Sequence, residues 1–188
     1  MELEILLDKV NTKSLLLFLT CATLVSSDWS EQPCLSTDHV PGSSLGVFAG
    51  LKLYTRYLKG LDNYSSEIDS LTWQFNKVQE NQYVVQLSMV TNDKKHSYMS
   101  FNWIDFPENQ VITDINEGSK GNQMYAIPFL ERNSTMVLYM CQEFDDGHHR
   151  HILQVLSLYL NHDVTKALEA ARKIAVDVKL PFKHRTMI

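Results

Sequence analysis

Histidine and aspartate residues gather in one short stretch of the sequence, where they could hold a metal ion. Asp145 and Asp146 are followed by His148, His149 and His151. Imidazole and carboxylate groups are zinc ligands, but recognised zinc motifs space their ligands at regular intervals that these residues lack. The sequence therefore predicts a solvated turn, with no metal and no cofactor.

Motifs of enzyme active sites are absent from the sequence. It contains no Gly-rich phosphate loop, no Gly-x-Ser-x-Gly turn, no His-Glu-x-x-His and no Cys-x-x-Cys. Cys141 falls within an apparent strand, which is not the electropositive setting that activates a thiol. Enzymatic activity is disfavoured, and a site built from scattered His, Asp and Tyr side chains is the weakest hypothesis.

Length and charge narrow the class of protein further. The 188 residues suit one domain with a core or a ligand cup. Charged residues make up 21% and hydrophobic residues 44%, an ordinary globular balance. The net charge is −5 and no basic run occurs, so nucleic acid is not an expected partner.

An apolar run near the N-terminus suggests secretion. Leu15–Val25 reads LLLFLTCATLV, which is too short to span a bilayer, so we expect no stable membrane insertion. Lys13 precedes the run and small residues precede Asp28, as in a signal peptide. We expect residues 1–27 to be a signal peptide and residues 28–188 to form a single secreted domain.

The acidic start of the chain supports an alternative. Glu2, Glu4 and Asp8 lie where a signal peptide is usually basic. In this alternative the segment stays attached as an amphipathic or buried helix, and the protein is cytoplasmic.

Secretion would affect the chemical state of cysteine and asparagine residues. Cleavage would leave Cys34 and Cys141, which could form a disulfide in an oxidising compartment or stay as two free thiols. Asn63 and Asn133 begin Asn-x-Ser/Thr acceptors, so glycosylation is expected at both.

Short segments with a two-residue period dominate the rest of the chain and predict half-buried strands. Turn residues separate them, and Pro128 predicts an edge or a bulge in its strand. The predicted strands are 71–78, 82–91, 97–106, 111–115, 124–130 and 135–144.

Two further segments are ambiguous between strand and helix. Residues 45–58 predict a strand followed by a looser turn or short helix, and residues 151–160 predict a strand. After Asp163, apolar residues at helical spacing predict an amphipathic helix over 164–178, which Pro181 ends.

About eight strands followed by one helix predict a mainly β fold. The economical arrangement is an eight-stranded antiparallel up-and-down barrel with one C-terminal α-helix, because closure removes exposed edges. The alternative is an α+β open antiparallel sheet with flanking helices.

This order of parts resembles the lipocalin family over roughly residues 44–187. Gly46-Val47-Phe48 occupies the place of the family's Gly-x-Trp motif, with Phe48 at the position of the tryptophan. The resemblance implies transport or sequestration of a small hydrophobic ligand, and a protein receptor or partner is compatible with it.

Inward faces of the predicted strands would line the barrel with apolar side chains, which suit a hydrophobic ligand. The same pattern would equally fill a solid core. In the alternative, an intracellular protein-interaction module, such as an inhibitor or chaperone, binds another protein on its sheet. The predicted ligand-binding residues are Trp73, Phe75, Tyr83, Val85, Leu87, Met89, Met99, Phe101, Trp103, Tyr125, Ile127, Leu138 and Met140.

Overall fold

A computed structural model describes most of the chain. The described residues are 33–59, 68–115, 122–131, 134–177 and 185–186. The predicted signal segment 1–27 and the predicted glycosylation sites Asn63 and Asn133 lie outside them.

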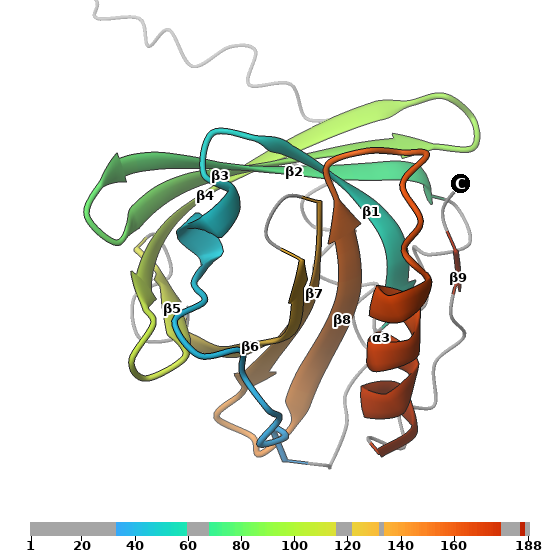
Figure 1. The fold of residues 1–188 in the computed structure, drawn as a ribbon. Coiled ribbons are helices and arrows are strands. Elements are labelled where there is room, and N and C mark those ends of the chain that lie inside the picture. Colours follow the sequence, from blue (N-terminus) through green and yellow to red (C-terminus); the bar gives the residue numbers. More distant parts are fainter. Residues whose placement is uncertain (1–32, 60–67, 116–121, 132–133, 178–184, 187–188) are drawn as a thin grey trace, which may run out of the picture.

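Eight antiparallel strands close into a ring, and one α-helix lies against its outside (Figure 1). The hydrogen-bonded order is β2-β3-β4-β5-β6-β7-β8-β1, and β1 returns to β2. The predicted barrel is therefore confirmed, and the alternative of an open sheet is wrong. The elements are η1 Leu45–Phe48, β1 Lys52–Lys59, β2 Ile68–Gln79, β3 Gln82–Thr91, β4 His96–Phe106, β5 Val111–Asp114, β6 Asn122–Glu131, β7 Thr135–Glu143, β8 His149–Ser157, α3 Thr165–Asp177 and β9 Arg185–Thr186.

Strand β1 closes the ring because its two edges pair with different strands. Lys52 to Tyr54 pair with β2, whereas Tyr54 to Lys59 pair with β8. A bulge between Thr55 and Tyr57 shifts the register with β8. The short strand β9 pairs with Tyr57 and Leu58.

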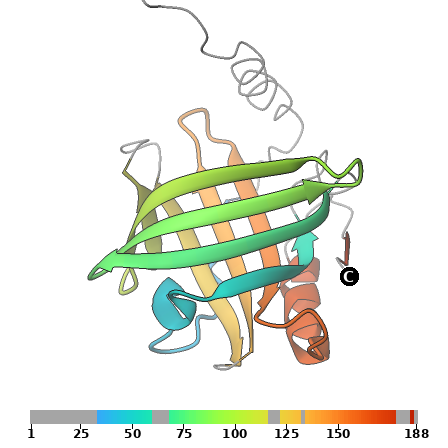
Figure 2. The same cartoon turned by 90° about the horizontal axis from the view of Figure 1, so that it is seen from above.

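Strands β2, β3 and β4 are long (Figure 2), and their sequences show the clearest alternation. Most of their inward side chains are apolar and buried, as at Phe75 and Val85, which are both 0% exposed. Their outward side chains include uncharged polar groups, and the Asn76 amide joins Gln74 to Gln86. One dry face and one wet face give the period of two that the sequence displays.

Strands β7 and β8 are instead buried on both faces. Helix α3 covers the outer face of the barrel, where Ala167 and Ala171 lie with Val137, Leu153 and other residues in a second apolar cluster. This double burial explains why residues 151–160 lack a clean alternation, although the predicted strand is confirmed by β8. The carboxylate of Asp163 accepts the backbone N–H of Thr165 at the helix start, as is typical of a residue that caps a helix.

Residues 45–58 correct the sequence-based prediction, because the helical turn precedes the strand. Leu45–Phe48 forms a 3-10 turn, and β1 begins only at Lys52. A 3-10 turn brings positions three apart to the same side, and both Leu45 and Phe48 are 1% exposed. Gly50 then adopts a positive φ of 81° and donates its N–H to the Phe75 carbonyl.

A bulge in β6 confirms the prediction made from Pro128. The register with β7 shifts between Ala126 and Phe129, so the backbone of Ile127 turns away from β7. The N-terminal arm, residues 33–41, takes over both bonds. The Ile127 N–H donates to His39 Nδ1 at 3.0 Å, and the Val40 N–H donates to the Ile127 carbonyl at 2.9 Å.

A disulfide also holds the arm to the barrel, which confirms the predicted Cys34–Cys141 bond. The two cysteines are 107 residues apart in sequence, and Cys141 lies on the outer face of β7. A covalent link across so long a loop restricts the unfolded chain strongly.

Gly46 generates a first prediction, because an added Cβ would lie 2.4 Å from the hydroxyl oxygen of Tyr83. Tyr83 is only 4% exposed and has little room to move. We expect Gly46→Ala to lower the free energy of unfolding by about 1–3 kcal/mol, the usual cost of overpacking. Urea denaturation measures this change.

Tyr83→Phe is the matched test, since it removes the clashing oxygen. In a double-mutant cycle it should restore part of the stability that Gly46→Ala loses. Strictly additive effects of the two substitutions would contradict the proposed clash.

Candidate functional site

The candidate site is the interior of the barrel, and the structure gathers nearly all predicted lining residues there. Met99 is the exception, since it is 44% exposed and lies outside the apolar cluster. Met89 and Phe101 are partly buried and pack against the cluster. The predicted residues buried within it are Trp73, Phe75, Tyr83, Val85, Leu87, Trp103, Tyr125, Ile127, Leu138 and Met140.

Burial of the inward side chains falls from one end of the barrel to the other. On β4, Trp103 is 3% exposed, Phe101 is partly buried and Met99 is 44% exposed. Met89 on β3 is likewise only partly buried, near the β3–β4 turn. The turn η1 lies across the opposite end (Figure 1). The barrel therefore has a floor at η1 and a mouth at the β3–β4 turn.

Four aromatic rings from β2 and β4 form a continuous wall inside the barrel. The ring centroids of Trp73 and Phe75 are 6.0 Å apart with nearly parallel planes. Trp103 lies 6.1 Å from Trp73 and 5.7 Å from Phe101. Such centroid distances are typical of interacting aromatic pairs.

Sequence reasoning missed a polar group at the middle of the barrel. The Gln154 side-chain oxygen accepts the Trp73 indole N–H at 2.9 Å and the Thr55 hydroxyl at 3.4 Å. Gln154 is 1% exposed. Its alternation with Ile152 and Leu156 was a readable signal, because positions two apart in a strand share a face.

A second missed group lies at Asp105, two residues beyond Trp103. The Tyr125 hydroxyl donates to the Asp105 carboxylate at 2.7 Å. Burial raises the pKa of Asp105, while hydrogen bonds from Tyr125 and the Leu45 backbone N–H oppose the rise. Burial and the Asp105 charge also raise the pKa values of Tyr125 and Tyr83. The barrel thus contains a carboxyl whose pKa lies above its ordinary value.

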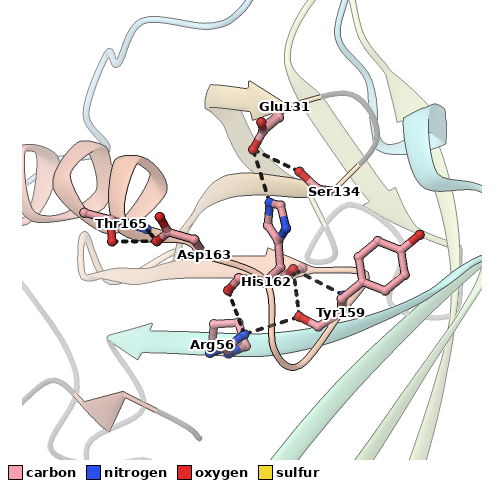
Figure 3. A network of polar contacts seen from close by, with 8 residues as sticks. Arg56, Glu131, Ser134, Tyr159, His162, Asp163 and Thr165 are labelled. Carbon is pink, nitrogen blue, oxygen red and sulfur yellow. Dashed lines mark hydrogen bonds and ion pairs between the residues drawn. The ribbon is translucent and has the colours of Figure 1, made fainter.

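Polar contacts outside the barrel hold the chain between β8 and α3 in place (Figure 3). Arg56 on β1 donates to the carbonyl oxygens of Tyr159 and His162. Glu131 on β6 contacts His162 at 3.4 Å and accepts the Ser134 hydroxyl, and these two bonds lower its pKa. The network therefore fixes where α3 starts.

Two hollows on the outer wall are lined by polar and apolar groups. One of about 230 Å³ lies between α3 and the β6–β7 hairpin, beside His162. The other, about 460 Å³, lies near Cys141 and Glu143 at the β7–β8 turn. Neither contains the aromatic wall.

The histidine-rich stretch divides between a turn and a strand. His148 and Asp146 lie in the turn, 3.2 Å apart, whereas His149 and His151 are buried on β8 at 8% and 1% exposure. The predicted solvated turn is therefore wrong for these two histidines. The Tyr139 hydroxyl and His151 Nδ1 are hydrogen-bonded at 2.8 Å, and the same hydroxyl accepts the backbone N–H of Leu35 in the arm.

The described residues contain neither a candidate metal site nor a candidate membrane-spanning helix. No group of three or more His, Cys, Asp or Glu side chains there is arranged to hold a metal ion. In the same part of the chain, no helix is long and apolar enough to cross a membrane.

The raised pKa of Asp105 generates a pH prediction. When the pKa of an acid is higher in the folded state than in the unfolded state, ionisation of that acid destabilises the fold. This destabilisation grows as the pH rises from 3.8, the ordinary pKa, through the pKa of the folded state. Asp105→Asn lacks this titration and can still accept the Tyr125 hydroxyl. We expect the stability of the variant relative to the unsubstituted protein to fall as the pH is lowered from neutrality towards 3.8. Urea unfolding at a series of pH values measures this relative stability. A rise in the stability of the variant relative to the unsubstituted protein on acidification would contradict the prediction.

Comparisons with known proteins show the fold. No protein-family model matches the chain, and no curated protein matches it. Among solved structures, lobster apocrustacyanin A1 is 15% identical, with a TM-score of 0.58, over 87% of this chain and 92% of that chain. Insecticyanin from the tobacco hornworm Manduca sexta is 13% identical, with a TM-score of 0.58, over 85% of this chain and 88% of that chain.

The amine binding protein of Rhodnius prolixus, solved as its tryptamine complex, is a third similar structure. It is 16% identical, with a TM-score of 0.55, over 80% of this chain and 84% of that chain. All three are lipocalins, and the similarity extends over most of each of them. The chain therefore has the lipocalin fold.

Proposed function

We propose that the protein binds and carries a small hydrophobic molecule inside its barrel. The observation that carries this proposal is the loss of burial along the inward rows, from Trp103 at 3% to Met99 at 44% exposure. A solid core would bury such a row throughout, whereas a cup leaves its rim accessible to a ligand.

The physical basis is the transfer of apolar surface out of water. An eight-stranded barrel is wide enough to hold either its own side chains or one small ligand. Each Å² of apolar ligand surface that enters contributes roughly 25 cal/mol, so a molecule of modest size can bind without any charge. Within the wall formed by Trp73, Phe75, Phe101 and Trp103, the Phe101 ring is only partly buried and offers an apolar face for such contact.

One of the similar structures adds support through its ligand. The amine binding protein of Rhodnius prolixus was solved with tryptamine, a small molecule with an aromatic ring. A fold of this kind can therefore hold one aromatic ligand. The identity of the ligand of the present protein depends on its own inward side chains.

We further propose that the protein is secreted, with residues 1–27 removed as a signal peptide. The Cys34–Cys141 disulfide supports this, because such bonds persist in oxidising compartments. Secretion would also expose Asn63 and Asn133 to glycosylation.

Ligand binding can be tested by titration with N-phenyl-1-naphthylamine, an uncharged apolar fluorophore. We expect a saturable increase of probe emission on excitation of tryptophan, with one site per chain. Phe101→Gln should weaken binding by about three- to tenfold, because it removes one aromatic face from the wall.

The matched control is Tyr98→Gln, which removes an aromatic ring from the same strand. Tyr98 is 74% exposed and its register places it on the outer face. This variant should bind the probe like the unsubstituted protein. Probe emission that never saturates, or equal weakening by both substitutions, would refute binding inside the barrel.

Secretion can be tested by expressing the full chain in eukaryotic cells and sequencing the N-terminus of the product. We expect protein in the medium with a mature start near Asp28. Protein retained in the cells with an intact Met1 would favour the cytoplasmic alternative.

A further inference from the structure

The Gln154 amide has a fixed orientation inside the barrel. The Trp73 indole and the Thr55 hydroxyl both donate to its oxygen, at 2.9 and 3.4 Å. An indole N–H can only donate, so the group facing it must be the amide oxygen. The NH2 group of Gln154 is therefore directed away from Trp73.

This NH2 group has no acceptor among the described residues. The interactions of Gln154 there are the two bonds to its oxygen. The side-chain nitrogen of Gln154 is not among the described atoms that are fully enclosed without a partner, so it keeps a small accessible area. The residue as a whole is 1% exposed. The nitrogen thus borders space within the barrel. A buried donor of this kind is normally satisfied by water or by a ligand.

The surroundings of the amide favour an uncharged partner. Leu156 and Ile152 are its neighbours on the inward row of β8, and both belong to or pack against the apolar cluster. An ion would lose its hydration there without a countercharge at the amide, whereas a neutral oxygen loses much less.

The aromatic wall adds a requirement of shape. Trp73, which holds the amide, is itself part of that wall, together with Phe75, Phe101 and Trp103. Phe101 is the ring of this wall that is only partly buried, so a flat π-system that enters the barrel can contact it while an attached oxygen reaches the amide.

We propose that the barrel selects a planar, uncharged molecule that carries a hydrogen-bond-accepting oxygen, such as an aromatic or conjugated ketone, and that Gln154 is the donor that recognises this oxygen. The inference rests on the proposed function, because it concerns the same interior site. It adds the chemical class of the ligand and the residue that selects it.

Two probes of nearly identical shape separate the hydrogen bond from apolar contact. In 2-acetylnaphthalene a carbonyl oxygen occupies the place of the methylene carbon of 2-isopropenylnaphthalene. Dissociation constants for both come from the quenching of tryptophan emission. Gln154→Leu should weaken binding of the ketone about three- to tenfold relative to the hydrocarbon, the range expected for one net hydrogen bond.

Thr55→Val provides the matched control. Thr55 donates to the same amide oxygen, but its loss leaves both the Trp73 bond and the NH2 group in place. This variant should keep the ratio of the two dissociation constants found for the unsubstituted protein. Near-ultraviolet circular dichroism and thermal unfolding show whether each variant is folded.

A second measurement needs no variant. The carbonyl stretching band of 2-acetylnaphthalene should move to lower frequency on binding to the unsubstituted protein than in a non-hydrogen-bonding solvent. Selectivity unchanged by Gln154→Leu, or a bound carbonyl band at the frequency of the apolar solvent, would overturn the assignment of Gln154. Failure of both probes to bind would instead refute the proposed function itself.

Discussion

Pairing of β1 with both β2 and β8 is the constraint on which the rest of the structure depends. Without it the sheet would keep two long unpaired edges, and the inward rows would lie open to water. The eight residues of β1 achieve the closure because one edge of the strand pairs with β2 and the other edge pairs with β8, with a bulge between Thr55 and Tyr57. Thr55 contacts Gln154 inside the barrel, so the strand that closes the ring also places a polar group inside it.

The floor and one side of the barrel both depend on irregular backbone. At the floor, η1 packs Leu45 and Phe48 into the core, and Gly46 lets it approach Tyr83. At the side, the bulge at Ile127 releases two backbone groups that the N-terminal arm then satisfies. The regular strands form the wall of the barrel. The irregular segments allow η1 to close its floor and the N-terminal arm to cover its side.

The sequence predicted the fold well where one face of a strand is wet. On β2, β3 and β4 many of the outward residues are polar, so period-two spacing identified the strands and the inward residues such as Trp73 and Trp103. On β7 and β8 both faces are apolar, because α3 covers the outside, and helix and strand were hard to separate. The order of turn and strand in residues 45–58 was wrong, since burial of Leu45 and Phe48 on one side depends on packing against distant strands.

Polar residues inside the barrel were the least predictable part of the candidate site. Gln154 and Asp105 occupy positions that alternation assigns to the interior, but an amide or carboxyl on an apolar row gives no sign of its partner. The partners Trp73 and Tyr125 come from strands 81 and 20 residues away. Only the three-dimensional arrangement shows that these groups are held in place.

The Cys34–Cys141 bond turns most of the barrel into a closed covalent circle. The circle contains β1 to β6 and most of β7, whereas β8 and α3 lie outside it. The chain connections β1–β2, β3–β4 and β5–β6 all fall within the circle, and the β7–β8 turn does not. A protease that cuts one of those three connections therefore opens the circle but leaves every strand covalently attached. The same cut between β7 and β8 would release β8 and α3 as a separate peptide, held only by pairing and packing.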